Sequence, residues 1–226
     1  MSRPRAARST PSVSPDRQRA PDPVVERFRT EVMARGSFTQ DWFTTAVPGW
    51  HAMVAELEGR QVRILEIGSF EGLSACYLLW RLPDARLTCL DTFAGSHEHD
   101  YLELEAGRLE AAFDRNVALV DARRVRKIVG DSKRAMLDLL LEAAGFELIY
   151  VDGSHAGLDV IVDAALSWQL LEIGGIVVFD DYAWTALGTD PLSRPGPAID
   201  AFLHLIEGKY EVVLDGHQLG LRKLSE

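Results

Sequence analysis

The segment QVRILEIGSFEGLSACYLLWRLPDARLTCLD, residues 61–91, holds the pattern that decides the fold. Residues 62–67 are mostly apolar, as in a buried parallel strand, and a turn with two glycines follows them. Residues 73–80 have the apolar density of a helix packed on a sheet, and residues 87–90 form a second apolar run. This order of strand, turn, helix and strand predicts the first half of a doubly wound α/β fold, in which ligands bind beyond the carboxyl ends of the strands.

The glycine turn departs from the loop that binds a dinucleotide. Such a loop has the pattern G-x-G-x-x-G, whose amide groups surround a pyrophosphate. Here Phe70 stands in the place of a middle glycine, and Glu66 puts a carboxylate where the loop begins. That charge repels phosphate and suits an ammonium group, while Asp91 lies about 20 positions past the turn, where an acidic residue meets ribose hydroxyls. The expected ligand is a nucleoside without phosphates that carries a cationic tail, as S-adenosylmethionine is.

The pattern Glu66-x-Gly68-x-x-x-Gly72, together with Asp91, resembles the first motif and the acidic loop of class I S-adenosylmethionine-dependent methyltransferases. The resemblance implies that S-adenosylmethionine is the cofactor and that a set of residues around the strand ends binds it. These residues are Glu66, Gly68, Ser69, Phe70, Gly72, Ser74, Asp91, Thr92, Asp131, Ser132 and Asp152. An α/β fold with an unrelated glycine turn is the alternative interpretation.

Size and composition narrow the class of protein. The 226 residues are enough for one α/β domain with a full core, and a formal net charge of −10 argues against a nucleic-acid partner, since phosphate binding needs a basic face. Cys76 and Cys89 fall in the expected helix and strand, as reduced core cysteines do. No apolar run is long enough to span a bilayer, and no signal-peptide core follows the N-terminus. We therefore expect a cytoplasmic protein without a membrane partner.

The first residues have a different composition from the rest. Residues 1–22 are rich in Arg, Ser and Pro and almost lack large apolar side chains, which predicts a disordered tail. Residues 23–226 are expected to form a single methyltransferase domain, opening with a helical segment, 23–58. Within that segment we expect helices at residues 24–35, 38–43 and 48–57. It can pack on the edge of the sheet, cover the cofactor or contribute to a homo-oligomer, and the sequence leaves these roles open.

Strands and helices continue to alternate after residue 91. Further strands are expected at residues 125–129, 146–151 and 176–179. Helices are expected at residues 101–120, 133–144, 158–171 and 198–207, with Gly174 and Gly175 closing the third of these. Residues 210–214 and 219–224 pair as a terminal hairpin. The sequence thus predicts a Rossmann-like doubly wound sheet, mostly parallel with an antiparallel last strand, and helices on both faces.

Acidic residues recur where the predicted strands end. They are Asp91, Asp131, Asp152, Asp180 and Asp181. The carboxyl ends of parallel strands meet at one rim, and carboxylates gathered there repel one another unless a cation lies among them. With Asp91 assigned to the ribose and Asp131 to the adenine amine, the other three offer the hard oxygen ligands that suit Mg²⁺. The alternative is that these aspartates cap the helix or turn that follows each strand.

A closer resemblance is carried by VDGSHAGLDVIVDAALSWQLLEIGGIVVFDDY, residues 151–182, in order with EIGSFEGLS, LDTFAGSHEHD and GDS. It is similar to the metal-dependent natural-product O-methyltransferases of the macrocin type, which act on sugar hydroxyls. The resemblance implies that Asp152, Asp180 and Asp181 hold a divalent cation, which binds the acceptor hydroxyl. It also implies a small hydroxylated substrate, a sugar or a natural-product intermediate. Ser154 stands where some members carry an aspartate proposed as the base.

Methyl transfer to a hydroxyl needs a group that removes its proton. A histidine suits this role near neutral pH, and we predict His155 as the base, with Asp152 and Asp181 as the other catalytic residues. A structural hydrogen bond at the start of a helix is the alternative role of His155. Two other functions compete with this one. An NAD(P)-dependent oxidoreductase of Rossmann type would need G-x-G-x-x-G, which is not apparent, and a non-catalytic methyltransferase-like binding protein would have lost the strand-end acids, which are present.

Overall fold

The protein is described by a computed structural model that covers residues 21–95, 107–185 and 190–226. The strands are β1 (Arg63–Ile67), β2 (Arg86–Asp91), β3 (Val125–Val129), β4 (Phe146–Val151), β5 (Leu171–Phe179), β6 (Tyr210–Asp215) and β7 (Leu219–Lys223). The α-helices are α1 (Pro23–Glu31), α2 (Val47–Ala55), α3 (Leu73–Arg81), α4 (Arg108–Ala118), α5 (Ser132–Leu141), α6 (Gly157–Leu170) and α7 (Pro195–Leu205). Residues 1–20 of the predicted tail 1–22 lie outside the described residues, and so do residues 101–106 of the predicted helix 101–120. No helix of the described chain is both long and apolar enough to cross a membrane.

The strands form one sheet in the order β3-β2-β1-β4-β5-β7-β6. The first five are parallel to their neighbours, whereas β7 runs antiparallel between β5 and β6. Strand order reverses between β1 and β4, the point at which a doubly wound sheet opens a crevice at its carboxyl edge. The predicted fold class is confirmed, including the antiparallel final strand.

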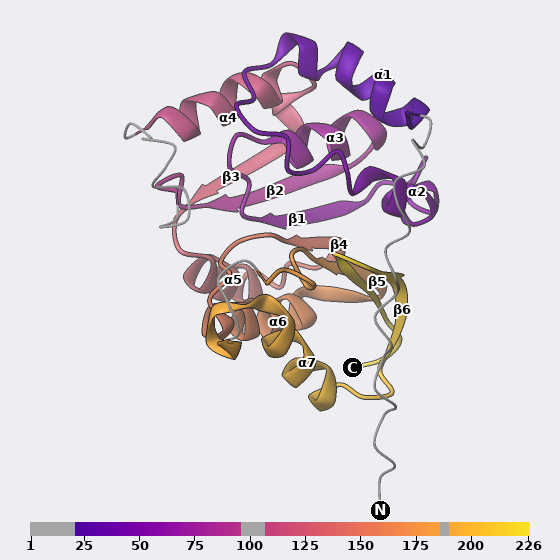
Figure 1. The fold of residues 1–226 in the computed structure, drawn as a ribbon, viewed down its shortest axis with the longest axis vertical. Helices are drawn as coiled ribbons and strands as arrows, with labels where there is room; N and C mark the ends of the chain where they lie inside the picture. The colour runs from indigo at the N-terminus through magenta and orange to yellow at the C-terminus, as the bar shows by residue number, and fades with distance from the viewer. Residues whose placement is uncertain (1–20, 96–106, 186–189) are drawn as a thin grey trace, which may run out of the picture.

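Helices cover both faces of the sheet because the central strands are buried on both sides (Figure 1). On one face, α1 to α4 pack in a core that includes Phe28, Trp50 and Tyr77. On the other face, α5 to α7 pack in a second core that includes Met136 and Phe202. The two cores fix the strands, and therefore the positions of the loops at their carboxyl ends.

Two details of the predicted elements are wrong. Residues 38–43 are not helical, because side chains take the backbone groups that a helix would use: the Thr39 amide donates to Glu71 Oε2 at 2.5 Å and the Thr44 amide to Asp41 Oδ1 at 2.9 Å. The fifth strand begins at Leu171, so the glycine pair that was expected to precede it lies inside β5. Gly174 has a φ of +84° there, and the pairing with β4 shifts register in this part of the strand.

Candidate active site

The glycine loop after β1 is pressed against the end of β4. Gly68 has a φ of +84°, and a Cβ at this position would lie 1.8 Å from the carbonyl oxygen of Asp152. Gly72 has a φ of +81°, and its Cβ would lie 2.9 Å from the Phe113 ring. Both positions therefore require glycine. The close approach at Gly68 places the predicted cofactor loop beside the first of the predicted metal ligands.

Asp91 holds the loop from the end of β2. Its Oδ2 accepts hydrogen bonds from the amides of Ser69 and Phe70, both at 2.7 Å, and its Oδ1 accepts one from the amide of Phe93 at 2.7 Å. Phe70 adopts a φ of +46°, and its ring lies 5.1 Å from that of Trp42. Asp91 thus shapes the loop itself. Its predicted role toward ribose hydroxyls stays a prediction, for which about one lone pair, on Oδ1, is left unused by these three hydrogen bonds.

Glu66 lies beneath the loop and has no exposed surface. Its Oε2 accepts a hydrogen bond from the Ser69 hydroxyl at 2.5 Å. Burial raises the pKa of Glu66 to about 7, and this rise is countered in part by Ser69, Ser74 and Cys89 around it. The Glu66 carboxylate thus contacts the loop through Ser69, and its predicted role toward an ammonium group stays a prediction.

Two aspartates share a buried tyrosine at the ends of β4 and β5. The Tyr150 hydroxyl donates to Asp180 Oδ2 and lies 3.2 Å from Asp152 Oδ2. Asp180 Oδ2 also accepts a hydrogen bond from Gln218 Nε2 at 3.0 Å. Burial, followed by the negative charges of Asp180 and Asp181, raises the pKa of Asp152 well above its ordinary value. Burial and the charge of Asp181 raise the pKa of Asp180 as well. Both carboxylates are therefore costly to ionise without added positive charge.

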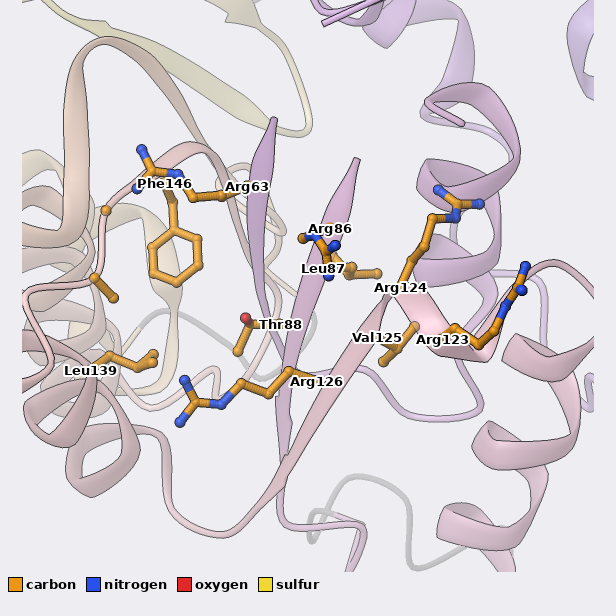
Figure 2. Close-up of a pocket in the computed structure, with 12 residues that line it drawn as sticks. Arg63, Arg86, Leu87, Thr88, Arg123, Arg124, Val125, Arg126, Leu139 and Phe146 are labelled. Atoms are coloured by element: carbon orange, nitrogen blue, oxygen red, sulfur yellow. The ribbon is translucent and has the colours of Figure 1, made fainter. Parts of the chain in front are cut away.

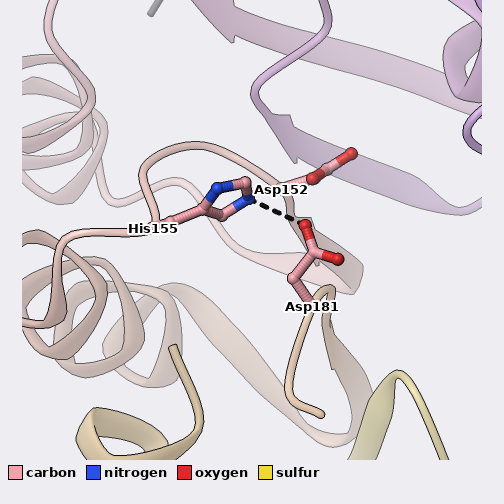
Figure 3. A group of neighbouring side chains, drawn as sticks. All are labelled: Asp152, His155 and Asp181. Atoms are coloured by element: carbon pink, nitrogen blue, oxygen red, sulfur yellow. Dashed lines mark ion pairs between the residues drawn. The ribbon is translucent and has the colours of Figure 1, made fainter. Parts of the chain in front are cut away.

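Asp181 lies between two histidines. Its Oδ2 is 2.7 Å from His155 Nε2, and its Oδ1 is 2.8 Å from His217 Nε2. Burial alone would raise the pKa of Asp181, but the hydrogen bonds and charges of the two histidines outweigh it and lower the pKa. Figure 3 shows His155 and Asp181 facing each other with Asp152 beside them. The ring of Trp184 packs against that of His155, with 4.4 Å between the ring centroids.

The described residues offer two groups of ligand atoms that lie within 4.8 Å of one another. One consists of Asp152, His155 and Asp181, and the other of Asp180, Asp181 and His217. Each group thus combines two of the three predicted aspartates with a histidine. The alternative role considered for these aspartates was capping of the helix or turn that follows each strand. Asp180 makes one contact of this kind, because its Oδ1 accepts a hydrogen bond from the Asp181 amide at 2.7 Å. Within the described part of the chain, Asp152 and Asp181 instead contact side chains.

The predicted adenine end of the site lies at the start of α5. Asp131 caps this helix by accepting a hydrogen bond from the Arg134 amide at 3.2 Å, so here the capping role is present. The Ser132 hydroxyl donates to Asp163 Oδ1 at 2.8 Å. Burial raises the pKa of Asp163 from 3.8 to about 6, against the lowering effect of Ser132. Thr92 is exposed, and its hydroxyl accepts from the Ala94 amide at 3.3 Å.

The raised pKa of Asp163 leads to a prediction for stability. The folded protein binds this proton more tightly than the unfolded chain, so the contribution of Asp163 to stability is present below pH 3.8 and is lost as the pH rises through about 6. Asp163→Asn should therefore increase the free energy of unfolding at pH 7.5 by about 2–3 kcal/mol, with little change at pH 4. Melting curves of both proteins across this range test it. The exposed Asp84→Asn serves as the control, and an equal shift at both pH values would contradict the assignment.

Four residues near the site were missed by sequence reasoning: Tyr150, Asp163, His217 and Gln218. Tyr150 was counted only as part of the predicted strand 146–151, and Asp163 only as part of the predicted helix 158–171. His217 and Gln218 lie in the hairpin between β6 and β7, which was identified only as a turn. The only signal in the sequence was that two polar residues, His217 and Gln218, stand in the turn that precedes the last predicted strand.

The comparisons with known proteins agree with this geometry. Residues 65–182, more than half of the chain, match the family described as a methyltransferase domain. The chain belongs to this methyltransferase family. The matched range extends from β1 to the residue after Asp181, and so contains the glycine loop and all three aspartates. This assignment removes the oxidoreductase alternative. Among curated proteins, none matches the sequence.

Several solved structures of methyltransferases share the fold of this chain. MycE, a methyltransferase from the mycinamycin biosynthetic pathway in complex with Mg, SAH and mycinamycin VI, is 18% identical with a TM-score of 0.62 over 89% of this chain and 55% of MycE. An O-methyltransferase from Bacillus cereus in complex with SAH is 16% identical with a TM-score of 0.60, over 90% of this chain and 92% of that one. TomG, an O-methyltransferase from Streptomyces achromogenes involved in tomaymycin synthesis and in complex with SAM, is 18% identical with a TM-score of 0.56, over 91% of each chain. This chain spans about half the length of MycE.

Proposed function

We propose that this methyltransferase uses S-adenosylmethionine to methylate a hydroxyl group of a small molecule, a sugar or a natural-product intermediate, with the help of Mg²⁺. The observation that carries the proposal is the position of Asp152. Its backbone contacts the glycine loop at Gly68, and its carboxylate belongs to the acid cluster with Asp180. A methyl donor in the loop and an acceptor at the cluster would therefore be neighbours.

The loop residues fit the methyl donor. When bound, S-adenosylmethionine would supply a methyl group for displacement at carbon, with the C–S bond breaking as the C–O bond forms and S-adenosylhomocysteine as the leaving group. Asp91 and Ser69 order the loop that would hold the amino-acid and ribose parts, while Asp131 and Ser132 lie at the start of α5, where we place the adenine. The negative charges of the strand ends suit a cationic donor. Holding the two reactants in line contributes most of the acceleration in such a transfer.

The acid cluster fits a divalent cation. Burial raises the pKa values of Asp152 and Asp180, and a divalent cation beside them would offset the cost of ionising these two carboxylates. Asp152, Asp180 and Asp181 would hold Mg²⁺, with the histidines as neighbours. The ion would supply Lewis acidity that lowers the pKa of the acceptor hydroxyl and fixes its direction.

We infer that His155 receives the proton of that hydroxyl. Its Nε2 lies 2.7 Å from Asp181 Oδ2, so the carboxylate orients the ring and stabilises the imidazolium that forms on protonation. Trp184 packs on the imidazole and screens it from water on one side.

The relatives support the class of substrate. MycE is described with Mg, SAH and a mycinamycin, and TomG with SAM in tomaymycin synthesis. These partners are those of the named proteins. They favour a hydroxylated natural product here because the chain shares their fold and has, at the same edge of the sheet, the acids and the histidine that such a reaction needs.

Calorimetry with S-adenosylhomocysteine tests the proposal. We expect saturable binding without metal, and a second binding event when Mg²⁺ is added that Asp180→Asn removes. NAD should not bind, since Phe70 and Glu66 disfavour a pyrophosphate. Methyl transfer to hydroxylated acceptors should stop in EDTA and return with Mg²⁺. Tight binding of NAD without any binding of S-adenosylhomocysteine would falsify the cofactor assignment, and full turnover in EDTA would remove the metal from the mechanism.

A further inference from the structure

A cavity of about 380 Å³ lies at the end of the sheet opposite the candidate active site (Figure 2). It is formed where β1 to β4 begin, together with the end of α5. Five arginines line it: Arg63, Arg86, Arg123, Arg124 and Arg126. Its apolar wall includes Leu139 and Phe146. Such a concentration of arginine contrasts with the net charge of −10 of the whole chain.

The strand register places three of these arginines on one face. Arg63 of β1 pairs in register with Arg86 of β2, and Thr88, two residues further along β2, pairs with Arg126 of β3. Partners in register, and residues two apart on a strand, point to the same side of a sheet. The three guanidinium groups and the Thr88 hydroxyl therefore belong to the face that α5 covers. Arg86 lies between the other two.

Four of the five arginines have partners in the protein. Arg63 contacts Glu147 at 2.6 Å and Glu172 at 2.9 Å. Arg126 contacts Glu142 at 2.6 Å. The other two lie next to Asp121 and the end of α3. Arg123 contacts Asp121 at 2.9 Å, and Arg124 donates to the backbone carbonyls of Leu79, Leu82 and Ala85 at 2.8 to 3.2 Å.

Arg86 is different. Its guanidinium forms no ion pair or hydrogen bond within residues 21–95, 107–185 and 190–226, although it stands next to the like charge of Arg63. In the described part of the chain, the carboxylates paired with the arginines of the cavity are Asp121, Glu142, Glu147 and Glu172, one fewer than the five arginines. Like charges at paired positions of a sheet are unfavourable, so this arrangement is explained best by an anion that is bound part of the time.

We propose that the cavity binds a small phosphate ester, with its phosphoryl group on Arg86 and its organic part against Leu139 and Phe146. A guanidinium presents a planar set of donors that matches an oxyanion in two places. A phosphoryl group has three terminal oxygens, enough to reach Arg86, the Thr88 hydroxyl and one neighbouring arginine at once. The cavity volume is close to the lower end of the range of about 300–1,000 Å³ seen for small-molecule sites. The site is independent of the methyl-transfer site.

The test uses the full chain saturated with S-adenosylhomocysteine, at low ionic strength in a phosphate-free buffer. Ribose 5-phosphate, inorganic phosphate and citrate are each titrated in by calorimetry. We expect saturable binding of ribose 5-phosphate at one site, weakened about tenfold or more by Arg86→Gln. Arg123→Gln is the matched control, because it removes the same charge from the same cavity but from a guanidinium that Asp121 already engages. It should change the affinity less than about twofold.

Three results would overturn the proposal. The first is the lack of saturable binding of either phosphate compound. The second is an equal loss of affinity in Arg86→Gln and Arg123→Gln, which would mean that the phosphate compound responds only to the overall positive charge of the cavity. The third is citrate binding as tightly as ribose 5-phosphate with the same dependence on Arg86, which would make the cavity a carboxylate site. Melting temperatures check the fold of each variant. Arg86→Lys keeps the charge but loses the planar set of donors. This variant is a second test, and it should also bind ribose 5-phosphate more weakly than the native protein does.

Discussion

Asp152→Asn should abolish methyl transfer while making the metal-free protein more stable. Turnover should fall about 100-fold or more, because the variant loses a ligand of the ion that activates the acceptor hydroxyl. Stability should rise because the pKa of Asp152 is raised by burial and by Asp180 and Asp181, so ionising it at neutral pH costs free energy in the folded state. The amide group of the variant can donate a hydrogen bond to the Tyr150 hydroxyl oxygen, which lies 3.2 Å from Asp152 Oδ2. The measurements are initial rates with saturating Mg²⁺ and melting temperatures in EDTA.

The control for this variant is Asp200→Asn. Asp200 also accepts a hydrogen bond from a tyrosine, Tyr182 at 2.8 Å, but it is exposed on α7. It should change neither the rate nor the effect of Mg²⁺ on the melting temperature. In Asp152→Asn the stabilisation by Mg²⁺ should be lost as well. A variant that keeps its activity, or one that is destabilised in EDTA, would contradict the role assigned to this carboxylate.

The fold follows from sequence periodicity to a large extent. The predicted strands 125–129 and 146–151 coincide with β3 and β4, since each is a short segment rich in β-branched or aromatic residues. The order of elements also fixes where the acids lie, because the carboxyl ends of parallel strands share one edge. Errors arose where tertiary contacts replace local preference. Glu71 holds residues 38–43 out of a helix, and pairing with β4 extends β5 backwards across two glycines.

The site could be predicted only in part, since its side-chain partners come from distant segments. The sequence places Asp180 and Asp181 after a strand, but not the residues that contact them. His217 and Gln218 reach them because β7 pairs antiparallel with β5, with Leu219 opposite Phe179. More than 30 positions of sequence separate these residues from Asp180 and Asp181, so no local sequence pattern indicates the contacts. Likewise, nothing in the motif predicts that Asp91 would bond to three amides of the loops it neighbours.

The two ends of the parallel strands carry opposite charges. Aspartates collect at the carboxyl ends and arginines at the starts of β1 to β3. Helices connect the carboxyl end of each parallel strand to the start of a later one, so residues from several segments meet at each end of the sheet. A cation at one end and an anion at the other would each relieve a local excess of charge. The two proposed sites can therefore be tested separately, by Asp152→Asn and by Arg86→Gln.

Gly68→Ala should cause the largest loss of stability among these variants. At φ +84° a side chain strains the backbone, and the new Cβ would lie 1.8 Å from the Asp152 carbonyl oxygen, so β1 and β4 must separate at the site. We expect the free energy of unfolding to fall by about 3–5 kcal/mol. Gly174→Ala separates the two causes, because Gly174 has the same φ of +84° but nothing within 4 Å of the position of its Cβ. It should cost about 1–2 kcal/mol and leave S-adenosylhomocysteine binding intact. Chemical denaturation of the two variants gives the difference. Equal losses would mean that backbone strain alone makes glycine necessary at Gly68, and that the contact between the loop and Asp152 does not couple the methyl donor to the acid cluster.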